Sequence, residues 1–190
     1  MKKIILSTAA LLFTTAAVFA QSWSIDKAHS QVMFTINHMG INTITGNFGT
    51  VNSSITASKD DFSDAVIEFT ADINSINTGN EQRNTHLKSP DFFNAAQYGT
   101  LTFKSTSFKK VDDKNYAVTG DLTLHGITKS VTLNATLNGT TVNPMSKKTV
   151  AGFKVTGTIK RTDFGIGAQF PSSMVSDEVA LDANTEFVKG

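Results

Sequence analysis

The sequence predicts an all-β protein whose strands form a barrel or a sandwich. Apolar and polar residues alternate through all eight positions of residues 131–138, as expected for a strand with one face in water. β-branched and aromatic residues dominate this run and similar ones, and turn residues separate them. The 190 residues include 14 phenylalanines and 39% hydrophobic residues, enough for the core of one domain. About eight or nine such strands at regular spacing favour a barrel or a sandwich.

The first twenty residues are predicted to be a cleaved secretory signal peptide. Lys2 and Lys3 precede an uncharged stretch of apolar and small residues over 4–19, and Ala20 stands directly before the expected cut. An uncleaved membrane anchor is the alternative, but this stretch is short for a spanning helix and is diluted by small and hydroxyl residues. We therefore expect an exported protein with a single domain over residues 21–190.

The apolar members of the alternating runs are expected to face the interior, because successive side chains on a strand point to opposite sides. In chain order they are Val32, Phe34 and Ile36; Ala65, Ile67, Phe69 and Ala71; Leu101 and Phe103; Val131, Leu133, Ala135 and Leu137; Phe153, Val155 and Ile159; and Val179, Leu181, Ala183 and Phe187. Turn residues at 112–115 and 143–144 mark two breaks between strands. The pair His125-Gly126 fits a tight two-residue hairpin, and this turn role is favoured over a ligand role for His125.

One segment breaks the β pattern and is predicted to be a short helical insert near residues 79–95. Thr78 and Glu81 have the spacing of a capping box, with Thr78 as the cap, so a helix is expected over residues 81–88. The side chains that would share one side of this helix are Arg83, His86 and Leu87.

The end of the insert is predicted to lie at a mouth of the β structure. Ser89-Pro90 has the pattern of a second helical turn, with Ser89 as N-cap, and the two large aromatics Phe92 and Phe93 follow. The insert would then be either a lid on a barrel or a helix that closes the open end of the core. Both interpretations place these aromatics at the mouth.

Charge balance and polar residues exclude several function classes. The 17 basic and 16 acidic residues give a net charge of +1, which argues against a nucleic-acid-binding surface and against a polybasic membrane anchor. Without cysteine there is no disulfide, thiolate nucleophile or cysteine-based zinc site. The four histidines lack helical metal-site spacing, and neither a G-x-S-x-G motif nor a P-loop is present. The sequence therefore predicts no catalytic residue, no metal site and no cofactor.

The only two arginines, Arg83 and Arg161, each have an aspartate nearby in the sequence. Either guanidinium could bind an anionic head group. The favoured interpretation is an ion pair, with Asp91 or Asp163, that ties the insert or a loop to the barrel. His86 would lie beside Arg83 and is a third head-group candidate.

Eight short pieces, in this order along the chain, together resemble the YceI-like family of exported lipid-binding proteins. They are residues 23–30 (WSIDKAHS), 37–40 (NHMG), 45–48 (TGNF), 75–79 (SINTG), 83–93, 120–126 (GDLTLHG), 161–165 (RTDFG) and 177–179 (DEV). Two positions depart from the family pattern. Asn84 replaces the usual aspartate after the insert arginine, which removes a charge pair from that position, and Gly99 replaces a proline that often follows the tyrosine.

This resemblance implies a lipocalin-like antiparallel eight-stranded β-barrel in the periplasm, with a long apolar pocket. The implied ligand is a polyisoprenoid, such as an isoprenoid quinone or a prenyl pyrophosphate, or another long-chain amphiphile, and homodimers are implied as well. Alternation along the strands then gives the candidate wall residues Phe34, Ile36, Ile67, Phe69, Leu101, Phe103, Leu122, Leu124, Leu133, Phe153 and Val155, with Phe92 and Phe93 guarding the mouth.

Several alternatives stay open on the sequence. The ligand could be a fatty-acid-type lipid bound in a stress response. Alternation cannot say whether the apolar face points inward, so a small outer-membrane barrel is possible, although Trp and Tyr total only three and the chain ends in Lys189-Gly190 without an aromatic. A small exported hydrolase is the third class, and the missing motifs disfavour it.

Overall fold

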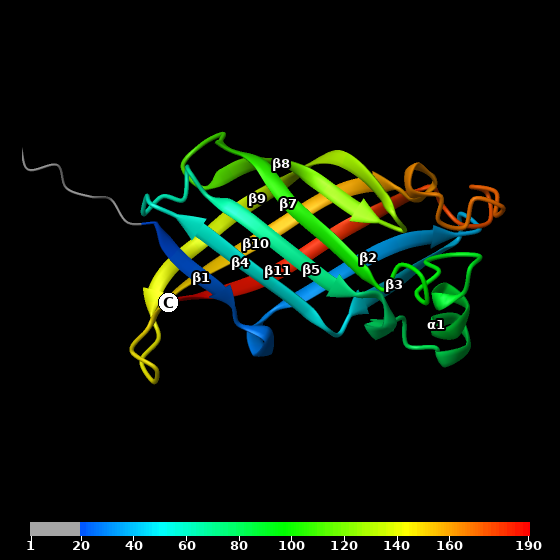
Figure 1. The fold of residues 1–190 in the computed structure, drawn as a ribbon, viewed down its shortest axis with the longest axis horizontal. Helices are drawn as coiled ribbons and strands as arrows, with labels where there is room; N and C mark the ends of the chain where they lie inside the picture. The colour runs from blue at the N-terminus through cyan, green and yellow to red at the C-terminus, as the bar shows by residue number, and fades with distance from the viewer. Residues whose placement is uncertain (1–19) are drawn as a thin grey trace, which may run out of the picture.

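The computed structural model describes residues 20–190, which form one antiparallel sheet of eleven strands (Figure 1). The predicted signal peptide lies outside the described residues except for Ala20 and stays a prediction. The strands are β1 (Gln21–Ile25), β2 (Gln31–His38), β3 (Asn42–Phe48), β4 (Val51–Ala57), β5 (Val66–Asp72), β6 (Ile76–Asn77), β7 (Thr100–Lys110), β8 (Asn115–Leu124), β9 (Ile127–Val142), β10 (Thr149–Lys160) and β11 (Glu178–Lys189). The helices are α1 (Glu81–Lys88) and the 3-10 turns η1 (Lys27–His29), η2 (Ile73–Ser75) and η3 (Arg161–Phe164). Within residues 20–190, no helix is long and apolar enough to cross a membrane.

Eight strands close into a barrel, which confirms the fold class. The ring runs β1-β4-β5-β7-β8-β9-β10-β11 and returns to β1. Strands β2, β3 and β6 extend the sheet from β11 toward one end. The strand number exceeds the expected eight or nine because η1 separates β1 from β2 and a tight turn separates β3 from β4. All the pairings are antiparallel, and a two-residue turn joins β8 to β9, whereas the insert with α1 joins β5 to β7.

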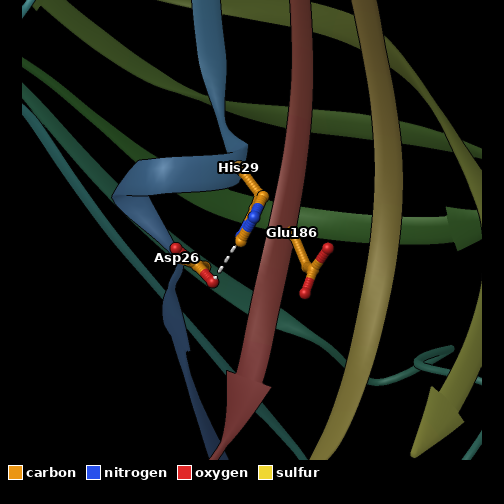
Figure 2. A group of neighbouring side chains, drawn as sticks. All are labelled: Asp26, His29 and Glu186. Atoms are coloured by element: carbon orange, nitrogen blue, oxygen red, sulfur yellow. Dashed lines mark hydrogen bonds and ion pairs between the residues drawn. The ribbon is translucent and has the colours of Figure 1, made fainter. Parts of the chain in front are cut away.

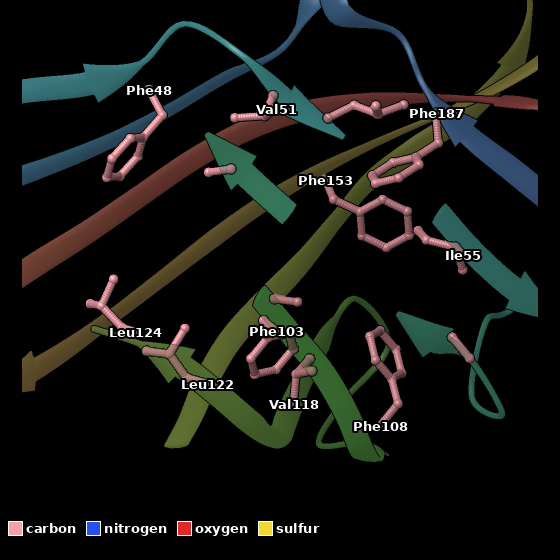
Figure 3. Packing of buried hydrophobic residues seen from close by; sticks show 14 of the residues in the cluster. Phe48, Val51, Ile55, Phe103, Phe108, Val118, Leu122, Leu124, Phe153 and Phe187 are labelled. Carbon is pink, nitrogen blue, oxygen red and sulfur yellow. The ribbon is translucent and has the colours of Figure 1, made fainter. Parts of the chain in front are cut away.

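The two ends of the barrel differ (Figure 1). One end holds α1, the β2–β3 turn and the segment that follows η3, whereas the C-terminus and the β9–β10 loop lie at the other. An aromatic cluster fills that second end. Trp23 packs on Phe62, Phe62 on Phe153 and Phe153 on Phe187, with ring centroids 5.1, 5.2 and 6.1 Å apart. Figure 3 shows Phe153 and Phe187 meeting inside the barrel. This end is therefore closed by side chains.

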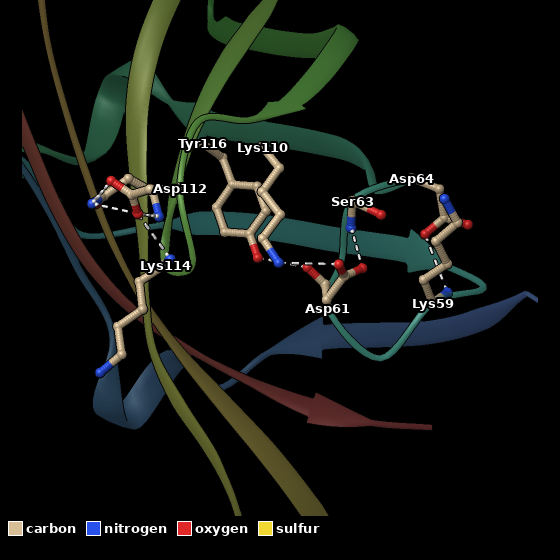
Figure 4. A network of polar contacts seen from close by, with 9 residues as sticks. Lys59, Asp61, Ser63, Asp64, Lys110, Asp112, Lys114 and Tyr116 are labelled. Atoms are coloured by element: carbon tan, nitrogen blue, oxygen red, sulfur yellow. Dashed lines mark hydrogen bonds and ion pairs between the residues drawn. The ribbon is translucent and has the colours of Figure 1, made fainter.

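A polar clamp holds the β4–β5 loop against the closed end (Figure 4). The buried Tyr116 donates from its hydroxyl to the Asp61 carbonyl at 2.6 Å, and Lys110 Nζ lies 3.3 Å from Asp61 Oδ2. The Ser63 backbone N–H donates to Asp61 Oδ1 at 3.1 Å. Hydrogen bonds from Ser63, followed by the Lys110 contact, lower the pKa of Asp61 to about 2. The clamp keeps Phe62 inserted in the aromatic cluster.

The tight hairpin at His125-Gly126 forms as the sequence indicated. His125 has φ 53° and Gly126 has φ 74°, and they join β8 directly to β9. The Nδ1 atom of His125 lies 2.9 Å from the Phe164 carbonyl oxygen, so this histidine serves the turn and its neighbouring loop. The breaks at 112–115 and 143–144 also fall between strands.

The helical insert has the predicted bounds but a different cap. The N-cap of α1 is Asn80, whose Oδ1 accepts from the Arg83 N–H at 2.9 Å, so the expected Thr78 cap is wrong. Thr78 instead donates from its N–H and its hydroxyl to Asn84 Oδ1, both at 2.8 Å. Asn84 is only 3% exposed, and its side-chain oxygen fixes the loop before α1 through these two hydrogen bonds. Ser89 ends α1 as its C-cap and turns follow, so no second helix begins there.

Candidate functional site

The barrel holds two adjacent cavities, an outer chamber at the α1 end and an inner chamber nearer the aromatic cluster. The outer chamber holds about 340 Å³ of open space and the inner chamber about 160 Å³. The residues that line both chambers are Phe34, Phe48, Leu101, Ile159 and Leu181. We call these five residues the waist. Because they border both spaces, the two chambers are adjacent and lie in line from the mouth toward the aromatic cluster.

Aromatic contacts build one side of the waist. The rings of Phe34 and Phe48 lie 5.7 Å apart, and Phe48 meets Phe93 edge-on at 6.3 Å. Phe34 also lies so close to Gly46 that a Cβ at this glycine would overlap its ring. The missing side chain of Gly46 therefore gives the Phe34 ring its place between the chambers.

All thirteen wall and mouth residues expected from the sequence line this cavity. The outer chamber contains Phe34, Ile36, Phe92, Phe93, Leu101 and Leu124. The inner chamber contains Phe34, Ile67, Phe69, Leu101, Phe103, Leu122, Leu133, Phe153 and Val155. Figure 3 shows part of this interior, where Phe103, Leu122 and Leu124 project from neighbouring strands. The strand residues among them face the chambers because each strand has its apolar face inside the barrel, whereas Phe92 and Phe93 come from the turns after α1. Their contact with a ligand stays a prediction.

Sequence reasoning missed the segment that follows η3. Ile166, Phe170, Met174 and Val175 line the outer chamber, yet they lie on turns without alternation. Phe170 stacks on Phe92 with ring centroids 5.0 Å apart and an angle of 16° between the rings. Apolar side chains on turns give no periodic signal, so only the neighbouring Arg161 could have drawn attention to this segment.

Arg161 holds that segment in place. Its side chain is 4% exposed, and its guanidinium donates to the backbone carbonyls of five residues. These residues are Ser176 (3.1 Å), Ile166 (3.0 Å), Gly167, Phe170 (2.6 Å) and Val175 (3.0 Å). No ion pair with Asp163 or any other carboxylate is found within residues 20–190. The expected ion pair is therefore wrong here, because the carbonyls of a tight turn satisfy the cation instead.

Arg83 lies at the mouth with a different set of contacts. Its Nε donates to Thr78 Oγ1 at 2.8 Å, and its Nη2 donates to the Thr78 carbonyl at 2.6 Å. Nη1 has no hydrogen-bond acceptor among the described residues, and Asp91 pairs with His86 Nε2 at 3.5 Å instead of with Arg83. Arg83 thus keeps one donor nitrogen for a ligand, whereas the donors of Arg161 are all engaged.

His86 completes the polar side of the mouth. Its ring meets Phe92 edge-on at 5.0 Å and Phe170 at 6.0 Å, and half of its side chain is exposed. The cationic or ionisable side chains that line the outer chamber are His38, Arg83, His86 and Arg161, and no carboxylate lines it. The site can therefore enclose an apolar chain and offer donors and positive charge at its opening.

The described residues form no serine–histidine or threonine–histidine pair. The histidine contacts found within residues 20–190 lead to Asp26, Asp91 and the Phe164 carbonyl, and none leads to a serine or threonine hydroxyl. The geometry of a serine–histidine pair, which defines such catalysis, is not formed here.

Comparison with known proteins now places the fold in a family. A YceI-like domain is matched over residues 23–187. The chain belongs to the YceI-like family. Protein YceI of Salmonella arizonae is 38% identical over 193 residues, which cover all of this chain and 99% of that protein. The same identity and coverage hold for Protein YceI of Salmonella paratyphi B.

Solved structures of similar proteins have the same barrel. The Campylobacter jejuni YCEI protein superimposes with a TM-score of 0.73 at 28% identity, covering 99% of this chain and 98% of that one. BcnA of Burkholderia cenocepacia gives a TM-score of 0.77 at 24% identity over 85% of this chain and 98% of that one. A polyisoprenoid binding domain from Saccharophagus degradans gives 0.64 at 20% identity over 88% and 98% of the two chains. The last two likenesses concern the fold alone.

Proposed function

We propose that this YceI-like protein is a periplasmic binding or carrier protein that holds one long-chain amphiphile inside its barrel. The observation that carries this proposal is the pair of adjacent apolar chambers, of which the outer one bears Arg83 and His86. A site of this shape suits a molecule with an extended hydrocarbon chain and a polar head. Binding, and not catalysis, is the function for which its residues are suited.

A polyisoprenoid, such as an isoprenoid quinone or a prenyl pyrophosphate, is the ligand class that we propose. Each buried CH₂ group contributes about 0.8 kcal/mol, so ten such groups supply about 8 kcal/mol. This is enough for a dissociation constant near the micromolar range, from which the cost of immobilising the chain must be subtracted. The solved Saccharophagus degradans domain, described as polyisoprenoid binding, has a similar fold and supports this choice.

We assign head-group contact to Arg83 and His86. The Nη1 atom of Arg83 is the donor left at the mouth among the described residues, and guanidinium donors suit a pyrophosphate or a carbonyl oxygen. Arg161 was also a candidate, but its guanidinium donates to five carbonyls and can supply only its charge.

The test is mass spectrometry of an organic extract from the mature protein, purified without detergent from its own organism. We expect one equivalent of an isoprenoid lipid. The delipidated protein should then bind an added prenyl chain, and Arg83→Gln should weaken the binding of a prenyl pyrophosphate more than that of the matching uncharged prenol. A fatty-acid-type lipid in the extract would replace the polyisoprenoid assignment. A folded protein that neither carries nor takes up any amphiphile would refute the binding function itself.

Export and assembly need separate measurements. Cell fractionation, with the mass of the recovered chain, should give a periplasmic protein that begins at Gln21. Light scattering should show whether the homodimer implied by the family resemblance forms. Recovery of the full 190-residue chain in the membrane fraction would refute the periplasmic assignment.

A further inference from the structure

The barrel is closed along a seam where strand β11 changes its partner. Phe187 of β11 lies opposite Ile25 of β1, whereas Asn184 lies opposite Gln31 of β2. Residues 26–30, which include η1, cross the gap between these two pairings. On this edge Glu186 of β11 therefore faces the η1 segment, whereas on its other edge it pairs with Gly152 of β10.

Backbone contacts fix the two sides of this seam. The Asp26 N–H donates to the Glu186 carbonyl at 2.7 Å, and the Glu186 N–H donates to Ser30 Oγ at 3.0 Å. Asp26 is also the N-cap of η1, since its Oδ1 accepts from the Ala28 N–H at 2.9 Å. The Asp26 and Glu186 backbones are thus held together without help from the His29 and Glu186 side chains.

Three ligand-type side chains meet at the seam (Figure 2). One nitrogen of His29 and one carboxylate oxygen each of Asp26 and Glu186 all lie within 4.8 Å of one another. Asp26 Oδ2 is 2.9 Å from His29 Nδ1, while the Glu186 carboxylate has no hydrogen bond or ion pair within residues 20–190. An Asp–His pair explains the first two groups. Glu186 places a second carboxylate beside the imidazole, so a cation at this point would face two negative charges.

We propose that Asp26, His29 and Glu186 bind one divalent transition-metal ion of the zinc type at the barrel seam. An imidazole nitrogen with two carboxylate oxygens is a donor set that such ions accept, and water would complete the coordination. Ligand bonds of about 2.0–2.2 Å require the donor atoms to approach to about 3–3.5 Å, which a rotation of the Glu186 side chain supplies. The ion would join η1 to the last strand and so fasten the closure of the barrel.

This site is separate from the lipid cavity. None of its three residues lines either chamber, and the His29 side chain is 65% exposed, so an ion can reach it from solvent. The helical spacing expected of histidine metal sites could not reveal it, because Glu186 is 157 residues beyond His29 in the chain.

The experiment is calorimetric titration of the mature, untagged protein with zinc chloride, together with thermal unfolding. We expect one equivalent of Zn²⁺ to bind and to raise the unfolding midpoint, because the ion binds only the folded seam. Glu186→Gln should weaken binding at least tenfold, and His29→Ala should abolish it. Glu178→Gln, the same change at an exposed position of the same strand, is the matched control and should bind Zn²⁺ like the wild type.

Two results would overturn the proposal. The first is a wild-type protein that binds less than one equivalent of Zn²⁺. The second is unchanged binding in Glu186→Gln, a variant that keeps the backbone contacts of the seam and therefore remains folded. Binding of Mg²⁺ as tight as that of Zn²⁺ would contradict the choice of metal, because Mg²⁺ prefers oxygen ligands and would not need His29.

Discussion

The inner chamber can be filled from strand β11 by a single change, Ala183→Leu. Ala183 faces this chamber, which holds about 160 Å³ of open space. The new side chain therefore enters free volume, whereas the same enlargement in a filled core costs about 1–3 kcal/mol. We expect the free energy of unfolding of the ligand-free variant to stay within about 1 kcal/mol of wild type. Urea unfolding of the delipidated proteins measures this.

The same change should weaken the binding of a long chain. Leucine adds three carbons to the chamber and displaces about three carbons of the ligand, which removes about 2.4 kcal/mol, or about 60-fold in affinity. Titration of the delipidated protein with prenyl alcohols of increasing length is the assay. Chains short enough to fit the outer chamber should bind equally well to the variant and the wild type, and the loss should begin only at longer chains.

Ala180→Leu provides the control for this experiment. Ala180 lies three residues earlier on the same strand and is exposed, so its enlargement leaves both chambers unchanged. Equal long-chain affinity of the two variants, with both folded, would refute the assignment of the inner chamber to the chain. A loss of more than about 3 kcal/mol of stability in Ala183→Leu would show that the chamber is already filled by side chains.

Three further changes test the walls and the mouth. Arg161→Lys should cost about 3 kcal/mol in urea unfolding, because an ammonium group cannot replace a buried guanidinium that donates to five carbonyls. Gly46→Ala should displace the Phe34 ring, lower stability by about 1–3 kcal/mol and weaken lipid binding, as read from unfolding and titration. Asp61→Asn should destabilise the protein at neutral pH, whereas Asp60→Asn should not. Hydrogen bonds lower the pKa of Asp61 from 3.8 to about 2, so the stability it provides is complete above about pH 5 and disappears as the pH falls toward 2. A wild-type minus Asp61→Asn difference that stays constant from pH 6 to 2 would contradict this.

Much of the barrel could be predicted because its strands alternate strictly. Strand β8 has buried Tyr116, Val118, Leu122 and Leu124 at every second or fourth position, with Gly120 between them. Strand β4 shows the limit of this signal. Its inward residues include Ser53 and Ala57, so the buried positions alternate in space while their hydrophobicity does not. Such a strand is recognised only once its neighbours β1 and β5 are in place.

The parts of the site that escaped prediction depend on contacts between distant segments. Arg161 was expected to form an ion pair, because an aspartate two residues away suggests one. The carbonyls that it contacts belong to the segment after η3, and no short sequence motif predicts the shape of this segment. Asp26 and Glu186 lie in different parts of the sequence, and only closure of the barrel brings them together. Local sequence patterns therefore predict the strand residues that line the chambers. The contacts at the mouth and at the seam depend on how distant segments are brought together by the fold.

The mouth combines a buried cation with a partly free one, and this arrangement bears on which head groups the proposed site would accept. Arg161 donates hydrogen bonds to neutral carbonyl groups, and no carboxylate neutralises its charge within residues 20–190. Its net positive charge therefore acts on the outer chamber, which it lines. Arg83, which also lines the outer chamber, adds a second positive charge and one open donor. An anionic head would lower the cost of holding both charges near an apolar wall, whereas a neutral quinone head would use only the donor. Head-group charge should therefore change affinity at the mouth while chain length changes it at the inner chamber, and the two effects should add because the residues involved are well separated.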